Sequence, residues 1–313
     1  MRVDTSAVPS GRTRIRVPRY RKRESVKDFL CVAPALAFFA VFVYYPLADL
    51  FRIGFTNWNL IRDSYKFVGL KNYKWLFHGS GLGTWLSSLR ITFSYTFWEI
   101  AITLIGGMLL AALFNRESKA FAAMRSLVFM PKYIAVSTSA IVFMWILNDQ
   151  YGFMNYLLGL FGVAPVSWLN SEKTAFTSLL ILTGWRVVGY GMMIYLSAMK
   201  GISKDYYEAA QLDGANGFQR FRFVTLPLLS PTTLFLFVTT FIASMKVFQS
   251  VDVMTDGGPY ESTNVMVYWI YDLAFVQFRV DRAAVVAGVF FVILLAFTAA
   301  TMKISNKNVH YDS

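Results

Sequence analysis

Six long apolar stretches restrict the folds that are open to this chain. They run approximately over residues 29–50, 89–114, 127–147, 174–199, 228–248 and 283–302. At 1.5 Å per residue, a helix of this length spans about 30 Å of hydrocarbon. With 56% hydrophobic and only 15% charged residues, the chain cannot bury most of its apolar surface in one soluble core. The sequence therefore predicts an all-α, polytopic membrane protein with six transmembrane helices.

Basic residues predict the orientation of these helices, because Lys and Arg are retained on the cytoplasmic side of a membrane. The N-terminal segment carries Arg2, Arg12, Arg14, Arg16, Arg19, Arg21, Lys22, Arg23 and Lys27. Both termini are then expected in the cytoplasm, with tails at 1–27 and 304–313 flanking a six-helix domain at 28–303. A second group after the first stretch weakens this orientation without reversing it: Arg52, Arg62, Lys66, Lys71 and Lys74. Since the same rule accounts for the net charge of +12, no nucleic-acid partner is expected.

A cleaved signal peptide is the alternative explanation of the basic start. The first apolar run is long enough to span a membrane, however, and no small-x-small cleavage site follows it cleanly. We therefore expect the segment to remain as the first span.

Several kinds of chemistry lack the residues that they need. The chain has one cysteine, Cys31, and two distant histidines, His78 and His310, so neither a zinc site nor histidine-based catalysis is expected. No stretch fits the phosphate-binding pattern G-x-x-x-x-G-K-S/T. We therefore expect no enzyme activity, no metal and no cofactor in this chain, and any energy from ATP must come from another subunit.

The segment 203–227, between the fourth and fifth apolar stretches, predicts a helix-turn-helix. Ser203 can cap a short helix that continues through residues 206–211, and Gly214 permits the left-handed conformation that ends it. A second short turn is expected from Phe218 to about Val224, before Pro227 and Pro231 prevent simple continuation. The carboxylate of Glu208 should then be exposed on the cytoplasmic side. An ordinary interfacial hairpin is the alternative.

The residues of this segment resemble a known docking loop. The order Glu208-Ala209-Ala210, Asp213-Gly214-Ala215, Phe221, Leu226-Pro227 and Pro231 is similar to the loop by which membrane subunits of binding-protein-dependent ABC importers dock onto their ATPase. The resemblance implies an ABC importer permease fold. The implied ATPase-coupling residues are Glu208, Ala209, Ala210, Asp213, Gly214, Ala215, Leu226 and Pro227.

Two other segments resemble carbohydrate permeases. The turn Asp256-Gly257-Gly258-Pro259, with Thr263 beyond it, resembles the T-x-G-G-P…T element of the first permease subunit in maltose and glycerol-phosphate systems. Residues 67–73 resemble the F-x-G-L-x-N-Y/F element after the first span, whereas 280–284 depart from the usual G-Y-A-S-A pattern. The Asp256 to Pro259 turn is expected to face an extracellular solute-binding protein.

The resemblance also implies partners and a location. The chain would lie in the lipid bilayer of a bacterial or archaeal plasma (inner) membrane. It would pair there with a second permease subunit and with an ABC ATPase dimer that uses ATP, and it would import a sugar-like substrate.

Within the predicted spans, Glu99 and Arg186 are placed at similar depths from the outer side. Ionisable groups at such depths cost about 2.5 to 3.5 kcal/mol on insertion scales, so they should face the bundle interior. We expect them either to pair or to flank the translocation path, with Trp185 as an aromatic neighbour. The alternative function is a stand-alone secondary transporter or channel driven by a proton through these two groups, which the absence of a visible inverted repeat disfavours.

Small residues indicate where helices approach closely. Gly107 with Ala111 forms a small-x-x-x-small edge in the second stretch, and Gly184, Gly189 and Gly191 serve the same purpose in the fourth.

Overall fold

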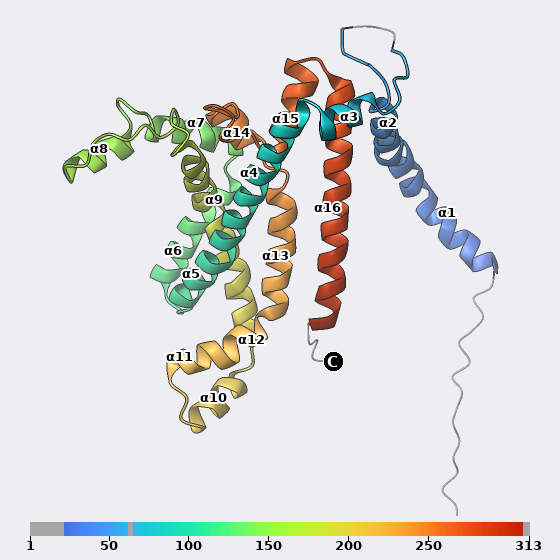
Figure 1. Ribbon diagram of the computed structural model, residues 1–313. Coiled ribbons are helices and arrows are strands. Elements are labelled where there is room, and N and C mark those ends of the chain that lie inside the picture. The colour runs from blue at the N-terminus through green and yellow to red at the C-terminus, as the bar shows by residue number, and fades with distance from the viewer. Residues whose placement is uncertain (1–21, 62–64, 309–313) are drawn as a thin grey trace, which may run out of the picture. The chain divides into compact units, whose positions relative to one another are not determined.

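The computed structural model describes residues 22–61 and 65–308, and these are almost entirely helical (Figure 1). An isolated bridge between Thr56 and Phe67 is the one β-type pairing among them. The outer parts of the two predicted tails, 1–21 and 309–313, lie outside the described residues. The helices are α1 (Lys22–Phe39), α2 (Tyr45–Ile53), α3 (Lys71–His78), α4 (Gly81–Ala101), α5 (Gly107–Phe114), α6 (Lys119–Phe129), α7 (Val136–Ile146), α8 (Phe153–Leu160), α9 (Ala175–Gly201), α10 (Lys204–Leu212), α11 (Gly217–Arg220), α12 (Leu226–Leu228), α13 (Ser230–Ser244), α14 (Gln249–Met254), α15 (Met266–Tyr271) and α16 (Val280–Asn308).

Five short stretches of other helical types join some of these helices. They are the π-helical stretches Ala40–Tyr44, Ile102–Gly106, Phe221–Thr225 and Asp272–Val276, and the 3-10 turn Met130–Tyr133. Because Ile102–Gly106 connects α4 to α5, the two form a single span over Gly81–Phe114.

The chain divides into two compact units, residues 1–49 and 50–313. The described part of the first unit is α1, a π-helical stretch and the start of α2. Its apolar side chains are exposed, among them Phe29, Phe38 and Phe42. A helix that is apolar and unburied over this length is typical of a membrane span. The second unit contains all the remaining elements.

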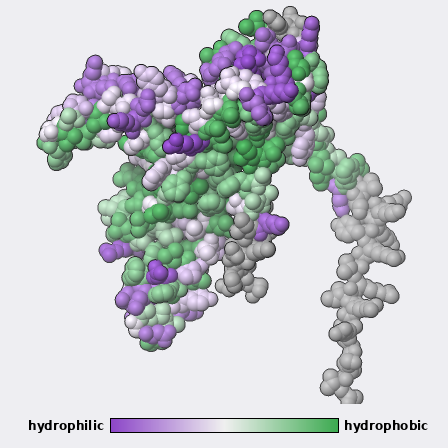
Figure 2. Space-filling model, viewed as in Figure 1, coloured by the Kyte–Doolittle hydropathy of each residue, from purple (hydrophilic) through white to green (hydrophobic). Residues whose placement is uncertain are grey.

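The predicted all-α membrane fold is confirmed. Four helices among the described residues are long and apolar enough to cross a membrane: Asp28–Ile53, Gly81–Phe114, Ala175–Gly201 and Val280–Thr301. Two bent pairs raise this number to six, Lys119–Tyr133 with Val136–Ile146 and Gly217–Leu228 with Ser230–Ser244. Figure 2 shows hydrophobic surface over the middle of the helices and hydrophilic surface gathered at their ends.

The third predicted span is not a continuous helix. Its two halves meet at 104°. Pro131 lies in the 3-10 turn just before the break, and Ile134 and Ala135 adopt extended backbone with ψ of 135° and 139°. A proline lacks the N–H that would continue the helical ladder, so a break in this region has a local cause. Its direction depends on the packing of α6 and α7.

Helix α9 forms the centre of the second unit, and half of its most apolar window is buried. Its C-terminal half packs Met192, Tyr195 and Leu196 against Ala111 and Leu236. Its N-terminal half packs Leu179 and Leu182 against a cluster that includes Ala140, Leu147 and Val251. A third cluster around Trp85, Met266, Trp269 and Val286 joins α4, α15 and α16. The two halves of α9 therefore position the neighbouring helices of the second unit.

A buried asparagine anchors α3. Asn72 Nδ2 donates to the carbonyl oxygens of Gly54, at 3.0 Å, and Thr56, at 2.7 Å. This contact explains the asparagine of the F-x-G-L-x-N-Y element in structural terms, because the side chain satisfies backbone groups that have no helical partner.

Asn155 organises the segment between α7 and α9 in the same way. Its Nδ2 donates to Asp149 O (3.1 Å) and Val166 O (2.9 Å). Its Oδ1 accepts from Val166 N (3.1 Å) and Trp168 Nε1 (2.9 Å). The single side chain thus joins both arms of the loop around α8.

Replacing Asn155 with alanine should loosen this loop. Buried groups left without partners cost about 1–3 kcal/mol each, so the closed loop should lose roughly 2 kcal/mol. We expect trypsin to cleave after Lys173 about ten-fold faster or more in the purified variant. Tyr156→Ala, which truncates a side chain that is 65% exposed on the same helix, is the matched control. Equal cleavage rates for the two variants would contradict the anchoring role.

Candidate functional site

The segment 203–228 folds into two short helices, and its first helix has defined ends. Ser203 caps α10 by accepting a hydrogen bond from Asp205 N at 3.3 Å, as the sequence predicts. At the other end Gly214 has φ +81°. Ala215 N donates to Ala210 O (2.9 Å) and Gly214 N to Gln211 O (3.0 Å). This pair of bonds is a Schellman motif, which requires the left-handed conformation that glycine adopts without strain.

The second helix also has a defined start. Asn216 and Gln219 form a reciprocal capping box, with distances of 2.9 Å and 2.8 Å. The helix runs through a π-helical stretch to Leu228, four residues further than predicted. The bend of 62° then falls at Leu229, between Pro227 and Pro231.

Two side-chain contacts hold the helices of this segment together. Tyr207 Oη and Thr225 Oγ1 lie 3.0 Å apart, and Arg220 Nη1 donates to Gln211 Oε1 at 3.3 Å. Thr225 is buried, so its hydroxyl needs this partner. The Tyr207–Thr225 contact was not predicted from the sequence, since eighteen residues separate the pair. The segment is therefore a tied hairpin. We call it the coupling loop (203–228), after the role that the resemblance of its residues implies.

The coupling loop exposes both carboxylates and large apolar side chains. Glu208 and Asp213 are exposed. Leu212 is 89% exposed, Phe218 72% and Phe223 69%. Figure 1 shows α10, α11 and α12 projecting below the ends of α9 and α13. Rigid projections that expose apolar groups beside charged ones are typical of protein interfaces.

Glu99 and Arg186 line one cavity of about 430 Å³. Its other lining residues are Tyr95, Lys132, Val136, Leu182, Thr183, Val187, Ala243, Lys246, Val247, Phe248, Gln249 and Ser250. We call it the mid-span pocket. The bond between Tyr95 Oη and Thr183 Oγ1, at 2.6 Å, ties α4 to α9 at its wall.

Glu99 and Arg186 share the pocket but do not pair. Among the described residues, no ion pair within 4.0 Å joins Glu99 to a basic side chain. Arg186 Nη2 instead donates to Ile134 O at 3.1 Å, at the break between α6 and α7. Trp185 packs its ring against Phe143, 5.2 Å between centroids, and does not line the pocket. Its predicted place on the path stays a prediction.

Two basic residues of this pocket were not among the residues singled out from the sequence. Lys132 and Lys246 lie within the predicted spans 127–147 and 228–248, so the apolar stretches themselves contained the signal. Lys132 Nζ lies 4.8 Å from the centroid of the Tyr190 ring, a cation–π distance that holds the ammonium group in place.

The turn 255–263 is tight, as its residues predict. Gly257 has φ +74°, Asp256 φ +47°, and the Gly258–Pro259 peptide is cis. The hydroxyls of Thr255 and Thr263 lie 2.8 Å apart, and Thr263 Oγ1 donates to Gly258 O at 2.7 Å. Thr263 thus closes the turn, which gives a physical reason for a threonine at this distance from the glycines. The side chain of Asp256 is exposed.

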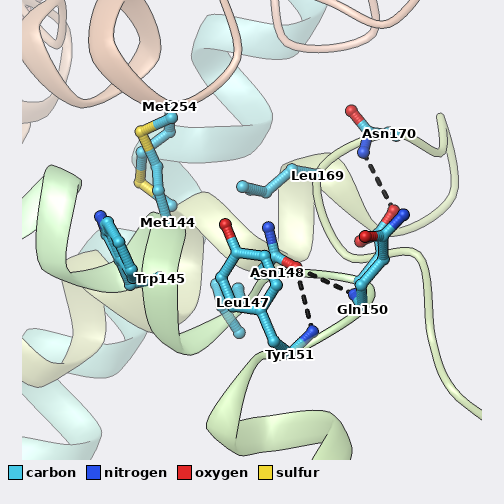
Figure 3. Close-up of a pocket in the computed structure, with 10 residues that line it drawn as sticks. Met144, Trp145, Leu147, Asn148, Gln150, Tyr151, Leu169, Asn170 and Met254 are labelled. Atoms are coloured by element: carbon cyan, nitrogen blue, oxygen red, sulfur yellow. Dashed lines mark hydrogen bonds between the residues drawn. The ribbon is translucent and has the colours of Figure 1, made fainter.

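A second cavity, of about 540 Å³, lies between the end of α7 with the residues after it, Leu169 and Asn170, and Met254 at the end of α14 (Figure 3). Asn148 Oδ1 accepts from Gln150 N at 2.9 Å and Tyr151 N at 3.2 Å. Asn170 Nδ2 donates to Asp149 Oδ2 at 2.9 Å. Among the described residues, no group of three or more His, Cys, Asp or Glu side chains could hold a metal ion.

The helical membrane domain and its projecting loop define a membrane-embedded transport subunit. Residues 103–307 match the family of binding-protein-dependent transport system inner membrane components, and the chain belongs to this family. It is a permease subunit of an ABC importer. It is 29% identical to the trehalose/maltose transport system permease protein MalF of Thermococcus litoralis, over 91% of this chain and 96% of that protein. It is 30% identical to the probable ABC transporter permease protein YurN of Bacillus subtilis, over 90% and 96%.

A solved structure has the same fold. A permease chain in the crystal structure of a bacterial ABC transporter that imports the acidic polysaccharide alginate matches with a TM-score of 0.80, at 22% identity, over 92% of this chain and 99% of that one. The family and the spans make this chain a multi-pass inner-membrane protein.

Proposed function

We propose that this subunit forms a translocation path with a second, related permease, that a separate ATPase dimer drives it, and that an extracellular solute-binding protein delivers a carbohydrate to it. Relatives named for trehalose/maltose, for sn-glycerol-3-phosphate (27% identical) and for arabinooligosaccharides (27% identical) support the substrate class. ATP would be used by the partner ATPase alone.

The coupling loop is the observation that carries this proposal. Capped, tied helices transmit a displacement better than an irregular loop, because few of their dihedral angles are free to absorb it. Glu208, Ala209 and Ala210 would sit in a cleft of the ATPase, and Asp213, Gly214 and Ala215 would set the turn between the helices. Leu226 and Pro227 would lead the motion into α13.

The route from the loop into the membrane is packed. Leu229, at the 62° bend, is 1% exposed, and Tyr195 Oη on α9 donates to Thr233 Oγ1 on α13 at 3.1 Å. A movement of the coupling loop would therefore turn α13 and α9 together. This rocking would alternate the path between its inward-open and outward-open states.

The same arrangement supports a cytoplasmic coupling loop. In Figure 1 the end of α16 lies on the same side of the helices as α10 to α12, while α14 and α15 lie on the other. With the loop inside, the end of α16 would be cytoplasmic too, and six spans, an even number, would put the N-terminus on the same side. The turn from Asp256 to Pro259 would then face the binding protein.

A charge reversal on the loop tests the proposal. We expect Glu208→Lys combined with Gly214→Asp to reduce the ATPase that copurifies with the tagged chain by about ten-fold or more, since reversing an interface charge costs several kcal/mol. Insertion and assembly with the partner permease should not change, because Glu208 and Gly214 are both exposed and Gly214 has no side chain to lose. Glu172→Lys makes the same charge change on an exposed residue before α9 and should retain the ATPase. Normal ATPase binding by the double variant would contradict the proposed docking role of the coupling loop.

A further inference from the structure

The mid-span pocket contains more positive than negative charge. Lys132 lines it from the 3-10 turn Met130–Tyr133, Arg186 from α9 and Lys246 from the turn after α13, and Glu99 is its one acidic residue. When the basic groups are protonated, the excess is at least two positive charges. A translocation path for neutral sugars has no electrostatic need for such an excess.

Two charged groups of the pocket lie deep within the spans, where an uncompensated charge is costly. Glu99 lies near the middle of the 34-residue span Gly81–Phe114, and Arg186 near the middle of the 27-residue α9. Basic groups at this depth are costly unless they meet water, protein or a counter-ion. Lys132 and Lys246 are exposed in the isolated subunit, so they cannot face lipid without penalty. They must face an aqueous path or a partner.

Among the described residues, the protein compensates these cations only in part, since Glu99 is the one carboxylate that acts on Lys132 and Arg186. Arg186 Nε is buried without a hydrogen-bond partner, and its Nη2 contacts only a neutral carbonyl, that of Ile134. The ammonium of Lys132 lies over the neutral ring of Tyr190. A guanidinium and two ammonium groups around a cavity match the oxygens of carboxylate and phosphate groups. A volume of about 430 Å³ is within the range of small-ligand sites.

We propose that the solute carried through the mid-span pocket is an acidic saccharide, whose carboxylate or phosphate groups bind Lys132, Arg186 and Lys246. Tyr95, Thr183 and Gln249, which line the same pocket, would hydrogen-bond its hydroxyl groups. This inference rests on the proposed function, because it takes the pocket to lie on the translocation path.

Cysteine labelling measures the charge of the pocket directly. Cys31 is the only cysteine, so Cys31→Ala provides a cysteine-free background. Ala243→Cys and Gln249→Cys would then place a thiol at two exposed lining positions. Gly159→Cys on α8, where an added Cβ has no atom within 4 Å, would serve as the reference. The complete complex in liposomes is labelled with a sulfonate-bearing or a trimethylammonium-bearing methanethiosulfonate.

The measured quantity is the labelling rate with the anionic reagent divided by the rate with the cationic reagent. We expect this ratio to be about ten-fold higher at the pocket positions than at Gly159→Cys, because a cationic cleft concentrates anions. Lys132→Met with Lys246→Met should remove most of this preference while keeping the side-chain length. Trigalacturonate, which carries carboxylates, or glucose 6-phosphate, which carries a phosphate, should slow labelling in the pocket. The solute that slows it more shows which of the two groups the pocket binds. Maltotriose should not.

Three results would overturn the inference. The first is an equal reagent preference at the pocket and at Gly159→Cys, which would mean that carboxylates of the partner permease neutralise the lysines. The second is no labelling at either pocket position, and the third is protection from labelling by maltotriose alone or by none of the three solutes. The proposed function fails separately, through normal ATPase binding by the Glu208→Lys, Gly214→Asp chain. A complex that loses its ATPase in that variant but lacks the charge preference contradicts only the substrate class.

Discussion

Replacing Gly191 or Gly189 with alanine should prevent stable assembly of the membrane domain. A Cβ on Gly191 would lie 2.3 Å from Thr103 O, and one on Gly189 would lie 2.0 Å from Val128 O. Both obstacles are backbone atoms of neighbouring helices, so no rotamer change relieves them. Overpacking of this kind costs about 1–3 kcal/mol or more, and two of the three core clusters form against α9.

The measurement is the amount of chain in membranes and its thermal unfolding in detergent. We expect both variants to lose most of the folded protein. Gly201→Ala, at the end of the same helix with nothing within 4 Å, and Gly184→Ala, whose nearest contact is 3.5 Å away, should behave as wild type. Equal stability of Gly191→Ala and Gly201→Ala would mean that α9 can move away from the π-helical stretch around Thr103.

Replacing Gly257 with valine should uncouple the binding protein from the transporter. Gly257 has φ +74°, a region that costs a β-branched residue about 1–3 kcal/mol, and its Cβ would lie 2.6 Å from Tyr268 Cε1. The Tyr268 ring is packed against Phe248 and Tyr271. The turn carrying Asp256 and Pro259 must therefore change shape.

ATP hydrolysis by the complete complex tests this result. We expect stimulation by the loaded binding protein to fall about ten-fold or more, because a displaced turn loses most of its interface contacts. Unstimulated hydrolysis and the copurified ATPase should stay normal, since the coupling loop is far from this turn in Figure 1. Gly83→Val, at an exposed glycine at the start of α4 with nothing within 4 Å, is the control. Normal stimulation in the Gly257 variant would show that the turn does not face the binding protein.

Local signals predicted the coupling loop well. The cap at Ser203 and the left-handed Gly214 depend on residues within a few positions of each other, and both are confirmed. The length of the second helix was underestimated. It continues to Leu228 because a π-helical stretch before Pro227 accommodates a residue that has no N–H.

The mid-span pocket was only partly predictable. Equal depth placed Glu99 and Arg186 together, and they do share a cavity. Depth says nothing about the direction of a side chain, so it could not show that Arg186 turns to Ile134 O instead. Lys132 lines the pocket just before the break at Ile134 and Ala135, and a straight helix over 127–147 does not predict that break.

The sequence by itself determined the membrane environment, the number of spans when each bent pair counts as one, the cap at Ser203, the left-handed Gly214 and the family. These depend on hydrophobic length and on short-range backbone chemistry, which the order of residues contains directly. Only the tertiary structure decided in which direction the third span turns at its break, how Tyr207 and Thr225 tie the loop, and which charged side chains share the mid-span pocket with Glu99. Those features arise from contacts between residues far apart in the chain, whose geometry depends on how the helices pack.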